Sequence, residues 1–359
     1  NFTNHQSAII YLTTFFSSTL PFLFYFIFLF YFHKKKSNID SEKFILLSLA
    51  LFVGTALFPF ATVLNNHLLP AVLCGIGVLF LKYTELKSNL FLFLLGILFS
   101  LATVFDPGAL FVAGCFSLYL LYLLFNKGFH KKQLFSLSFY ILGLLMPIIL
   151  HWLVNIQITG DILPASMHPE FFNYPGSVFS QDNLTNASFA VSGWREWFKY
   201  AGSMLLGQRG FLSHNPLFIV VILFTIGLLF KKGVAVRKRL YYTATLVSFI
   251  LVVLYYSLYG KNYGGSSYTV RWFLIFIPLF IPIILEMVGL GKRKILVLII
   301  VLSFVTAIWS VPASGLVFKN VSANPGWHMK NVIVKFPKYL REQVNNWCGM
   351  LNVGHRLGS

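Results

Sequence analysis

The stretch LFLFLLGILFSLATVFDPGALFVAGCFSLYLLYLLF at residues 90–125 decides the class of fold. It consists of two continuous apolar runs, 90–105 and 109–125, joined by the turn Asp106-Pro107-Gly108. About 20 apolar residues cross a bilayer core as a helix, and neighbouring helices shelter a somewhat shorter run. Because the runs are continuous and do not alternate with polar residues, helices are favoured over a membrane barrel. The stretch therefore predicts two membrane helices joined by a tight turn.

The composition of the whole chain agrees with this interpretation. Of its 359 residues, 57% are hydrophobic and 11% are charged, whereas an ordinary soluble domain is about 25% charged. This composition excludes a soluble enzyme. The chain has 28 Lys and Arg against 10 Asp and Glu, and in so apolar a chain this excess indicates loops that face an anionic leaflet, with no nucleic acid as partner.

Other apolar runs of similar length predict an all-α, polytopic transmembrane helical bundle of about ten spans. A transmembrane domain is expected over residues 1–310 and an external tail over 311–359. The ten expected spans are 8–32, 44–64, 68–83, 90–105, 109–125, 134–154, 216–230, 240–258, 273–290 and 295–310.

The charges of the connections predict the orientation of the bundle. Lys and Arg are concentrated in the alternate connections 33–43, 82–89, 126–133, 231–239 and 291–294. The positive-inside rule places these connections in the cytoplasm and both ends of this chain outside it. We therefore expect a multi-pass protein of the plasma membrane, or of the endoplasmic reticulum in a eukaryote.

The longest external connection, 156–215, lies between spans six and seven. Its many aromatic residues argue against disorder, because they need a surface to pack on. Within it, residues 193–206 carry apolar side chains at a spacing of three to four, which predicts an amphipathic helix in the membrane interface.

Among the acids on the external side, Asp106 stands at the bilayer edge, where a carboxylate is costly unless it is paired or used. An Asp before Pro at a helix start is equally typical of a helix cap. Asp161 is a second candidate acid on this side. No two histidines have a metal-ligand spacing such as i, i+4, so a metal is not indicated and the cofactor stays unknown.

Two further segments carry positive charge beside glycine and aromatic residues. The turn between spans eight and nine holds Lys261 and Arg271, with Tyr263 and Tyr268 between them, and a third basic residue, Arg209, precedes span seven. Such residues suit a phosphate and a stacked sugar. They are equally typical of interfacial anchors at a membrane surface.

These turns resemble the bacterial polytopic glycosyltransferases of the GT-C superfamily, which includes protein O-mannosyltransferases and the aminoarabinose transferase of lipid A. The residues that carry the resemblance are LNNHLLP at 64–70, FDPG at 105–108, GQRGFLSHNP at 207–216 and YGGSSYTVRW at 263–272. The resemblance implies transfer of a sugar from a polyprenyl-phosphate carrier to a lipid, glycan or protein acceptor on the external face.

The candidate site residues fall into three groups. Asp106 or Asp161 is the candidate catalytic acid. Arg209, Lys261 and Arg271 are the candidates for the donor phosphate. The candidates for the sugar and acceptor are His67, His168, Glu170, Tyr174, His214, Tyr263 and Tyr268.

One feature departs from the family pattern. The family carries its catalytic acid in the first large external loop, between the first two spans, whereas this chain begins outside the cytoplasm just before a span. Either Asp106 or Asp161 acts instead, or the acid precedes Asn1, or the chain is inactive. The alternatives are a transporter or flippase for a lipid-linked glycan, a surface-polysaccharide polymerase or ligase, and a scaffold subunit without chemistry.

Overall fold

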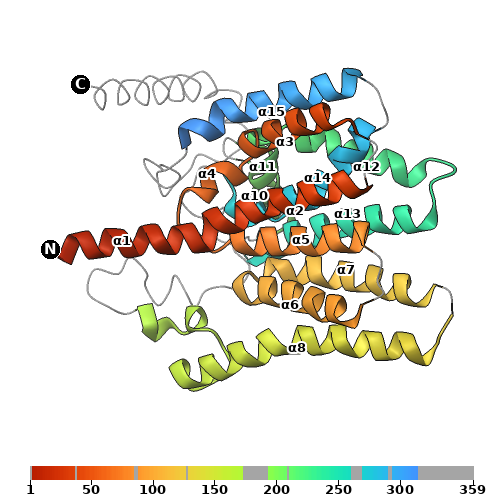
Figure 1. Ribbon diagram of the computed structural model, residues 1–359. Helices are drawn as coiled ribbons and strands as arrows, with labels where there is room; N and C mark the ends of the chain where they lie inside the picture. Colours follow the sequence, from red (N-terminus) through yellow and green to blue (C-terminus); the bar gives the residue numbers. More distant parts are fainter. Residues whose placement is uncertain are drawn as a thin grey trace, which may run out of the picture.

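In the computed structural model the described residues form helices joined by turns and short connections, with no strand among them (Figure 1). Those residues are 2–36, 39–84, 88–126, 128–172, 193–207, 210–259, 269–289 and 293–313. The expected all-α class is therefore confirmed for this part of the chain. Of the expected tail at 311–359, residues 314–359 lie outside the described residues.

The helices follow the expected apolar runs closely. The first half of the chain forms α1 (Phe2–Thr14), the π-helical η1 (Phe15–Thr19), α2 (Leu20–Lys36), α3 (Ser41–Val53), α4 (Leu57–Ala61), α5 (Leu68–Tyr83), α6 (Asn89–Phe105), α7 (Gly108–Phe125) and α8 (Lys131–Thr159). The second half forms the 3-10 turns η2 (Ala165–Met167) and η3 (Pro169–Phe172), then α10 (Trp194–Leu206), α11 (Phe211–His214), α12 (Leu217–Phe230), α13 (Val236–Tyr259), η4 (Arg271–Phe273), α14 (Phe276–Gly289) and α15 (Arg293–Ala313).

The count of ten spans is not confirmed. Four helical segments are long and apolar enough to cross a membrane: Ala8–Phe32, α7, α8 and α13. A fifth arises if Trp194–His214 and Leu217–Phe230, which meet at a bend of 99°, form one span. The apolar helices α5, α6 and α14 are shorter, and the expected span 44–64 is interrupted between α3 and α4. The described chain is thus a membrane protein with at least four candidate spans.

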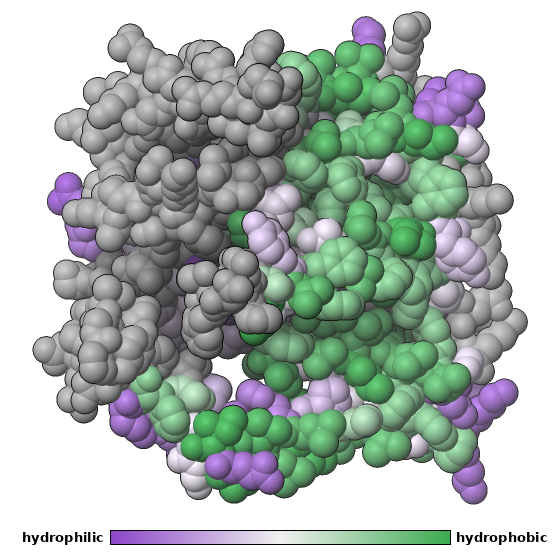
Figure 2. All heavy atoms as spheres, turned by 60° about the vertical axis from the view of Figure 1, so that its left-hand side comes forward, coloured by the Kyte–Doolittle hydropathy of each residue, from purple (hydrophilic) through white to green (hydrophobic). Residues whose placement is uncertain are grey.

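Much of the described surface is apolar, as a lipid bilayer requires. Large apolar side chains on α8, such as Leu142, Trp152 and Leu153, are exposed. Figure 2 shows hydrophobic side chains over much of the described surface, with hydrophilic ones near its margins. Apolar groups in such numbers are costly in water and harmless in lipid.

The helices α5, α6, α7, α8 and α13 lie side by side between two ends of the molecule (Figure 1). One end carries Lys82, Lys131, Lys231 and Arg237, and we call it the basic end. The other end carries the turn between α6 and α7, and we call it the Asp106 end. These four basic residues therefore lie at the opposite end of the helices from the buried Asp106.

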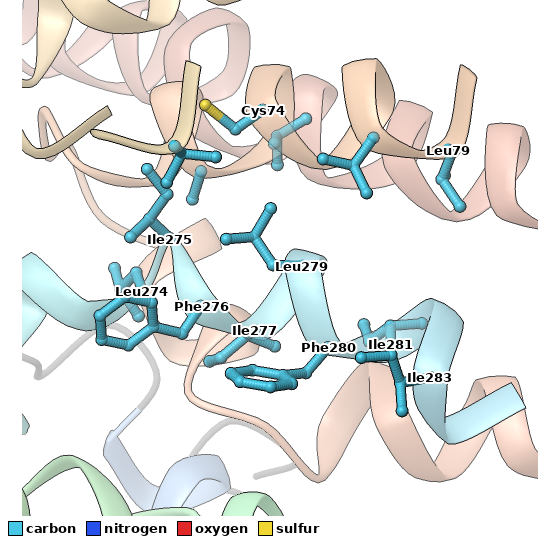
Figure 3. Close-up of a cluster of buried hydrophobic side chains, with 14 of the residues drawn as sticks. Cys74, Leu79, Leu274, Ile275, Phe276, Ile277, Leu279, Phe280, Ile281 and Ile283 are labelled. Atoms are coloured by element: carbon cyan, nitrogen blue, oxygen red, sulfur yellow. The ribbon is translucent and has the colours of Figure 1, made fainter. Parts of the chain in front are cut away.

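Contacts of α5 with α2 and α14 form the centre of the bundle. Figure 3 shows Ile275 and Leu279 on the α14 side of this core and Cys74 and Leu79 on α5. The missing side chain of Gly75 makes the contact possible, because a Cβ there would lie 2.4 Å from Cβ of Pro278.

A tyrosine of α2 completes this core. Pro282 inside α14 has no N–H, which frees the carbonyl four residues earlier. That carbonyl, of Pro278, accepts a hydrogen bond of 2.9 Å from the buried Tyr25 hydroxyl. Pro282 thus removes a hydrogen bond within α14 and leaves a carbonyl free to join α14 to α2.

Glycines also bring α6 and α8 into backbone contact. A Cβ on Gly96 would lie 2.3 Å from the Tyr140 carbonyl oxygen, and one on Gly143 would lie 2.1 Å from that of Phe93. Small residues at such contacts are typical of membrane helix pairs, which gain stability from close packing.

We expect Gly143→Val to destabilise the protein by about 1–3 kcal/mol, because the new side chain forces α8 away from α6. The matched control is Gly114→Val on α7, where a Cβ meets nothing within 4 Å. Thermal unfolding in detergent should show a lower midpoint for the first variant alone. Equal midpoints for both variants would contradict the close packing.

Candidate functional site

The carboxylate of Asp106 is the most deeply buried acid among the described residues. Asp106 ends α6 and is 1% exposed. Its Oδ2 lies 2.8 Å from Nδ1 of His67, and its Oδ1 accepts hydrogen bonds from the Gly108 backbone N–H, at 2.9 Å, and from the Tyr256 hydroxyl. A buried carboxylate is tolerated only when its oxygens have donors, and each oxygen here has at least one.

His67 reaches this carboxylate because the turn before α5 is fixed. His67 is the residue before the first residue of α5, and it is 6% exposed. The Asn65 side chain holds the turn: its oxygen accepts from the N–H groups of His67 and Leu68, and its amide donates to the carbonyls of Phe60 and Val63. The Asn of the LNNHLLP segment therefore positions the His of the same segment.

Nδ1 is the ring nitrogen of His67 that faces the Asp106 carboxylate. A neutral ring beside an ionised carboxylate would carry its proton on Nδ1, which leaves Nε2 as the acceptor. Nε2 has no hydrogen-bond partner among the residues that the structure describes. The pair therefore presents a nitrogen lone pair supported by a carboxylate, the arrangement that suits a general base.

Tyr256, on α13, is the site residue that the sequence analysis missed. Its ring stacks on Trp272 with centroids 4.7 Å apart and planes at 11°. Gly108 makes room for it, because a Cβ on Gly108 would lie 2.7 Å from Cε2 of Tyr256. Tyr256 lies inside an apolar run with no turn signal beside it, and only its place in the last turns of a helix that ends at the Asp106 end could have suggested it.

Arg271 begins the turn η4, directly before Trp272. Desolvation lowers the pKa of its guanidinium, and the proximity of Tyr256 opposes this effect. An arginine stays charged under such conditions. The expected phosphate residue Arg271 thus lies beside the aromatic residues that line the Asp106 site.

The expected amphipathic helix is present as α10, and it lies against α13. Trp197 of α10 donates a hydrogen bond of 3.0 Å from Nε1 to the Ser257 hydroxyl, next to Tyr256. The tryptophan-rich start of α10 is thereby fixed beside the site. Its apolar residues Trp194 and Phe198 stay exposed.

Three other candidate residues form a separate group after α8. Nε2 of His168 lies 3.2 Å from Oδ1 of Asp161, and Nδ1 lies 3.1 Å from Oε1 of Glu170. Within the described chain, no hydrogen bond joins this group to Asp106. His168 bridges both carboxylates, so Asp161 is engaged in a surface ion pair.

The remaining candidates do not join either group in what the structure describes. His214 is buried at the end of α11, where its Nδ1 lies 3.1 Å from the Gly210 carbonyl oxygen. The expected residues Arg209, Lys261, Tyr174, Tyr263 and Tyr268 lie outside the described residues. Among the described residues, no group of three or more His, Cys, Asp and Glu side chains could hold a metal ion.

Comparisons of the chain with models of protein families, with curated proteins and with solved structures give no match. The geometry of the Asp106 site therefore carries the functional argument.

We expect Tyr256→Phe to lower the free energy of unfolding by about 1–3 kcal/mol, because it removes a donor from a buried carboxylate. Tyr255→Phe is the matched control, since no hydrogen bond of the Tyr255 hydroxyl exists within the described residues. Chemical unfolding in detergent compares the two variants. A loss of stability in Tyr255→Phe as large as in Tyr256→Phe would contradict the geometry of the site.

The group at His168 predicts a pH dependence. Desolvation acts to lower the pKa of His168, but the hydrogen bonds and charges of Glu170 and Asp161 outweigh it and raise the pKa above 6.5. A backbone hydrogen bond is the largest cause that lowers the pKa of Glu170 below 4.5; desolvation opposes it, and His168 adds to it.

Stabilisation by His168 is therefore complete below pH 6.5 and lost as the pH rises through its raised pKa. Stabilisation by Glu170 is complete above pH 4.5 and lost as the pH falls through its lowered pKa. Hydrogen exchange of residues 161–171, corrected for its intrinsic pH dependence, should show the strongest protection between about pH 4.5 and 6.5. In His168→Gln the loss of protection at higher pH should disappear, and a variant that retained it would contradict the assignment.

Proposed function

We propose that the protein is a membrane glycosyltransferase of GT-C type that moves a sugar from a polyprenyl-phosphate donor to a lipid, glycan or protein acceptor. The observation that carries the proposal is the buried pair of His67 and Asp106, at the end of the bundle opposite the basic end. An ionisable side chain that is buried among membrane helices is costly, and this cost makes a functional role the first hypothesis for it. Both residues belong to segments that resemble the family, LNNHLLP and FDPG.

The basic end faces the cytoplasm in this proposal, in keeping with the positive-inside rule. The Asp106 end then lies on the external side, together with both termini of this chain. A polyprenyl-phosphate carrier places its phosphate at the level of the lipid headgroups. The proposed site lies at the end of the helices, and therefore near the level of the headgroups.

In the proposed reaction, Nε2 of His67 takes the proton of an acceptor hydroxyl while Asp106 holds the ring and stabilises its positive charge. The acceptor oxygen forms a bond to the anomeric carbon of the donor. The bond from that carbon to the phosphate oxygen breaks, and its electron pair leaves with the polyprenyl phosphate. His67 is thus the proton acceptor, and Asp106 is its positioning residue.

Arg271 is the proposed contact for the donor phosphate, whose negative charge increases as the sugar leaves. The stacked pair of Tyr256 and Trp272 beside it offers an aromatic face of the kind that suits a sugar ring. Arg209 and Lys261 remain further candidates for the phosphate on the strength of the sequence.

The test follows turnover and binding of an undecaprenyl-phosphate-linked hexose separately. Membranes that contain the protein should release the labelled sugar from the lipid fraction. In His67→Gln this rate should fall by a factor of about 10²–10⁴, as expected for loss of a general base. Tryptophan fluorescence of the purified variant, with Trp272 in the site, should show donor binding within about twofold of the wild type.

The control is Tyr255→Phe, which should keep both turnover and binding. Arg271→Ala should weaken donor binding at least about tenfold, as expected for a charge-assisted contact. Unchanged turnover in His67→Gln would contradict the proposal.

A flippase for a lipid-linked glycan is the second candidate, and one observation favours it. Glu286 of α14 lies 3.2 Å from the Lys82 ammonium group, and such ionisable pairs among membrane helices also mark transport pathways. The same experiment separates the two functions. A flippase binds the donor and moves it between leaflets without breaking the bond to the sugar.

A further inference from the structure

Two adjoining cavities open at the basic end, remote from the Asp106 site. The larger has a volume of about 600 Å³ and lies between the connection from α12 to α13 and the end of α14. The smaller has a volume of about 460 Å³ and lies between the end of α5 and the first turns of α13. Tyr83, Lys238 and Glu286 line both cavities and separate them.

The lining of these cavities has an excess of positive charge. Lys231, Lys232 and Lys238 line the larger cavity, and Glu286 is its one acid. Glu286 is already engaged: it lies 3.2 Å from the Lys82 ammonium and 3.8 Å from that of Lys238, and it accepts a hydrogen bond of 2.5 Å from the Tyr242 hydroxyl. Lys231 and Lys232 therefore face the larger cavity without a described acid beside them, and an anion would complete their coordination.

A buried hydroxyl points to the same conclusion independently. Tyr241 lines the smaller cavity and is 3% exposed, and its hydroxyl has no hydrogen-bond partner among the described residues. Lys82 holds the ring in place, with its ammonium 4.6 Å from the ring centroid. A buried donor without a partner costs free energy, which a polar ligand in the cavity would recover.

The larger cavity is also lined by apolar residues, among them Phe224, Leu228 and Leu285. Phe224 and Leu228 belong to α12, whose neighbouring residues Leu223 and Phe230 are exposed large apolar side chains. The lining of the cavity thus combines lysines with apolar residues of a helix that exposes further apolar side chains. This combination fits a molecule with an anionic head and an acyl chain.

We infer that the basic end binds the headgroup of an anionic phospholipid, with the phosphate at Lys231, Lys232 and Lys238 and an acyl chain along Phe224 and Leu228. The polar part of the headgroup reaches the smaller cavity, where it accepts the hydrogen bond of the Tyr241 hydroxyl. Basic pockets between membrane helices are the usual sites for such headgroups. This site is separate from the proposed transfer site and does not depend on it.

The test is native mass spectrometry of the detergent-purified protein titrated with phosphatidylglycerol, and with phosphatidylcholine as the zwitterionic counterpart. The variant is Lys231→Gln with Lys232→Gln, on the exposed turn before α13. Its matched control is Lys131→Gln with Lys132→Gln, which removes the same charge from the start of α8 at the same end. Phosphatidylglycerol binding should weaken about 30-fold in the first variant and less than about threefold in the control.

A third variant, Tyr241→Phe, tests the hydroxyl. It should weaken phosphatidylglycerol binding about tenfold, while the thermal midpoint of the lipid-free protein stays the same or rises because an unpartnered donor is gone. Equal loss in both double-lysine variants would overturn the inference, as would equal binding of the two lipids. Displacement of phosphatidylglycerol by equimolar inorganic phosphate would overturn it too, because the site would then bind free phosphate.

Discussion

The burial of the Asp106 carboxylate is the constraint on which the Asp106 end of the bundle depends. An ionised carboxylate among apolar helices is unstable unless donors surround it. Three elements supply them: His67 before α5, the backbone of Gly108 at the start of α7, and Tyr256 near the end of α13. The need to satisfy one side chain thus fixes the relative positions of helices that are far apart in the sequence.

The basic end holds a second carboxylate, that of Glu286, whose partners differ from those of Asp106. Its partners are two ammonium groups and a tyrosine hydroxyl, so positive charge exceeds negative charge around it. Among the described partners of Asp106, only His67 can be cationic. The Asp106 end is therefore suited to proton transfer, and the basic end is suited to hold an anion.

The sequence predicted the helices well because each apolar run is continuous and each connection carries polar or turn residues. The expected span 44–64 was continuous, although Pro59 within it is a residue that can break a helix. The break between α3 and α4 coincides with a tertiary contact: a Cβ on Gly54 would lie 2.6 Å from Cβ of Ser303, so α15 approaches α3 closely at that point. The number of spans likewise depends on whether neighbouring helices cover the ends of a short apolar helix. The local sequence of that helix does not determine this.

The site was predictable in part. The Asp106 side chain accepts the Gly108 N–H at the start of α7 and also contacts His67, so the expectation that this carboxylate is paired is met, whereas its use in chemistry stays a prediction. His67 was expected among the residues for sugar or acceptor, but its pairing with Asp106 was not, since the two are 39 positions apart in the chain. Tyr256 could not be distinguished from other tyrosines of α13, because the last turns of this helix contain several. Local sequence therefore identified the acid, whereas only the packing of α5 and α13 identified its partners.

The protonation state of the His67 ring tests the central claim most directly. Nitrogen-15 NMR of the detergent-purified protein with labelled histidine, assigned by comparison with His67→Gln, reports which ring nitrogen carries the proton. The account predicts a proton on Nδ1 and an unprotonated Nε2 that shifts when an undecaprenyl-phosphate-linked hexose binds. A ring with the proton on Nε2 and a bare Nδ1 facing Asp106 would contradict it.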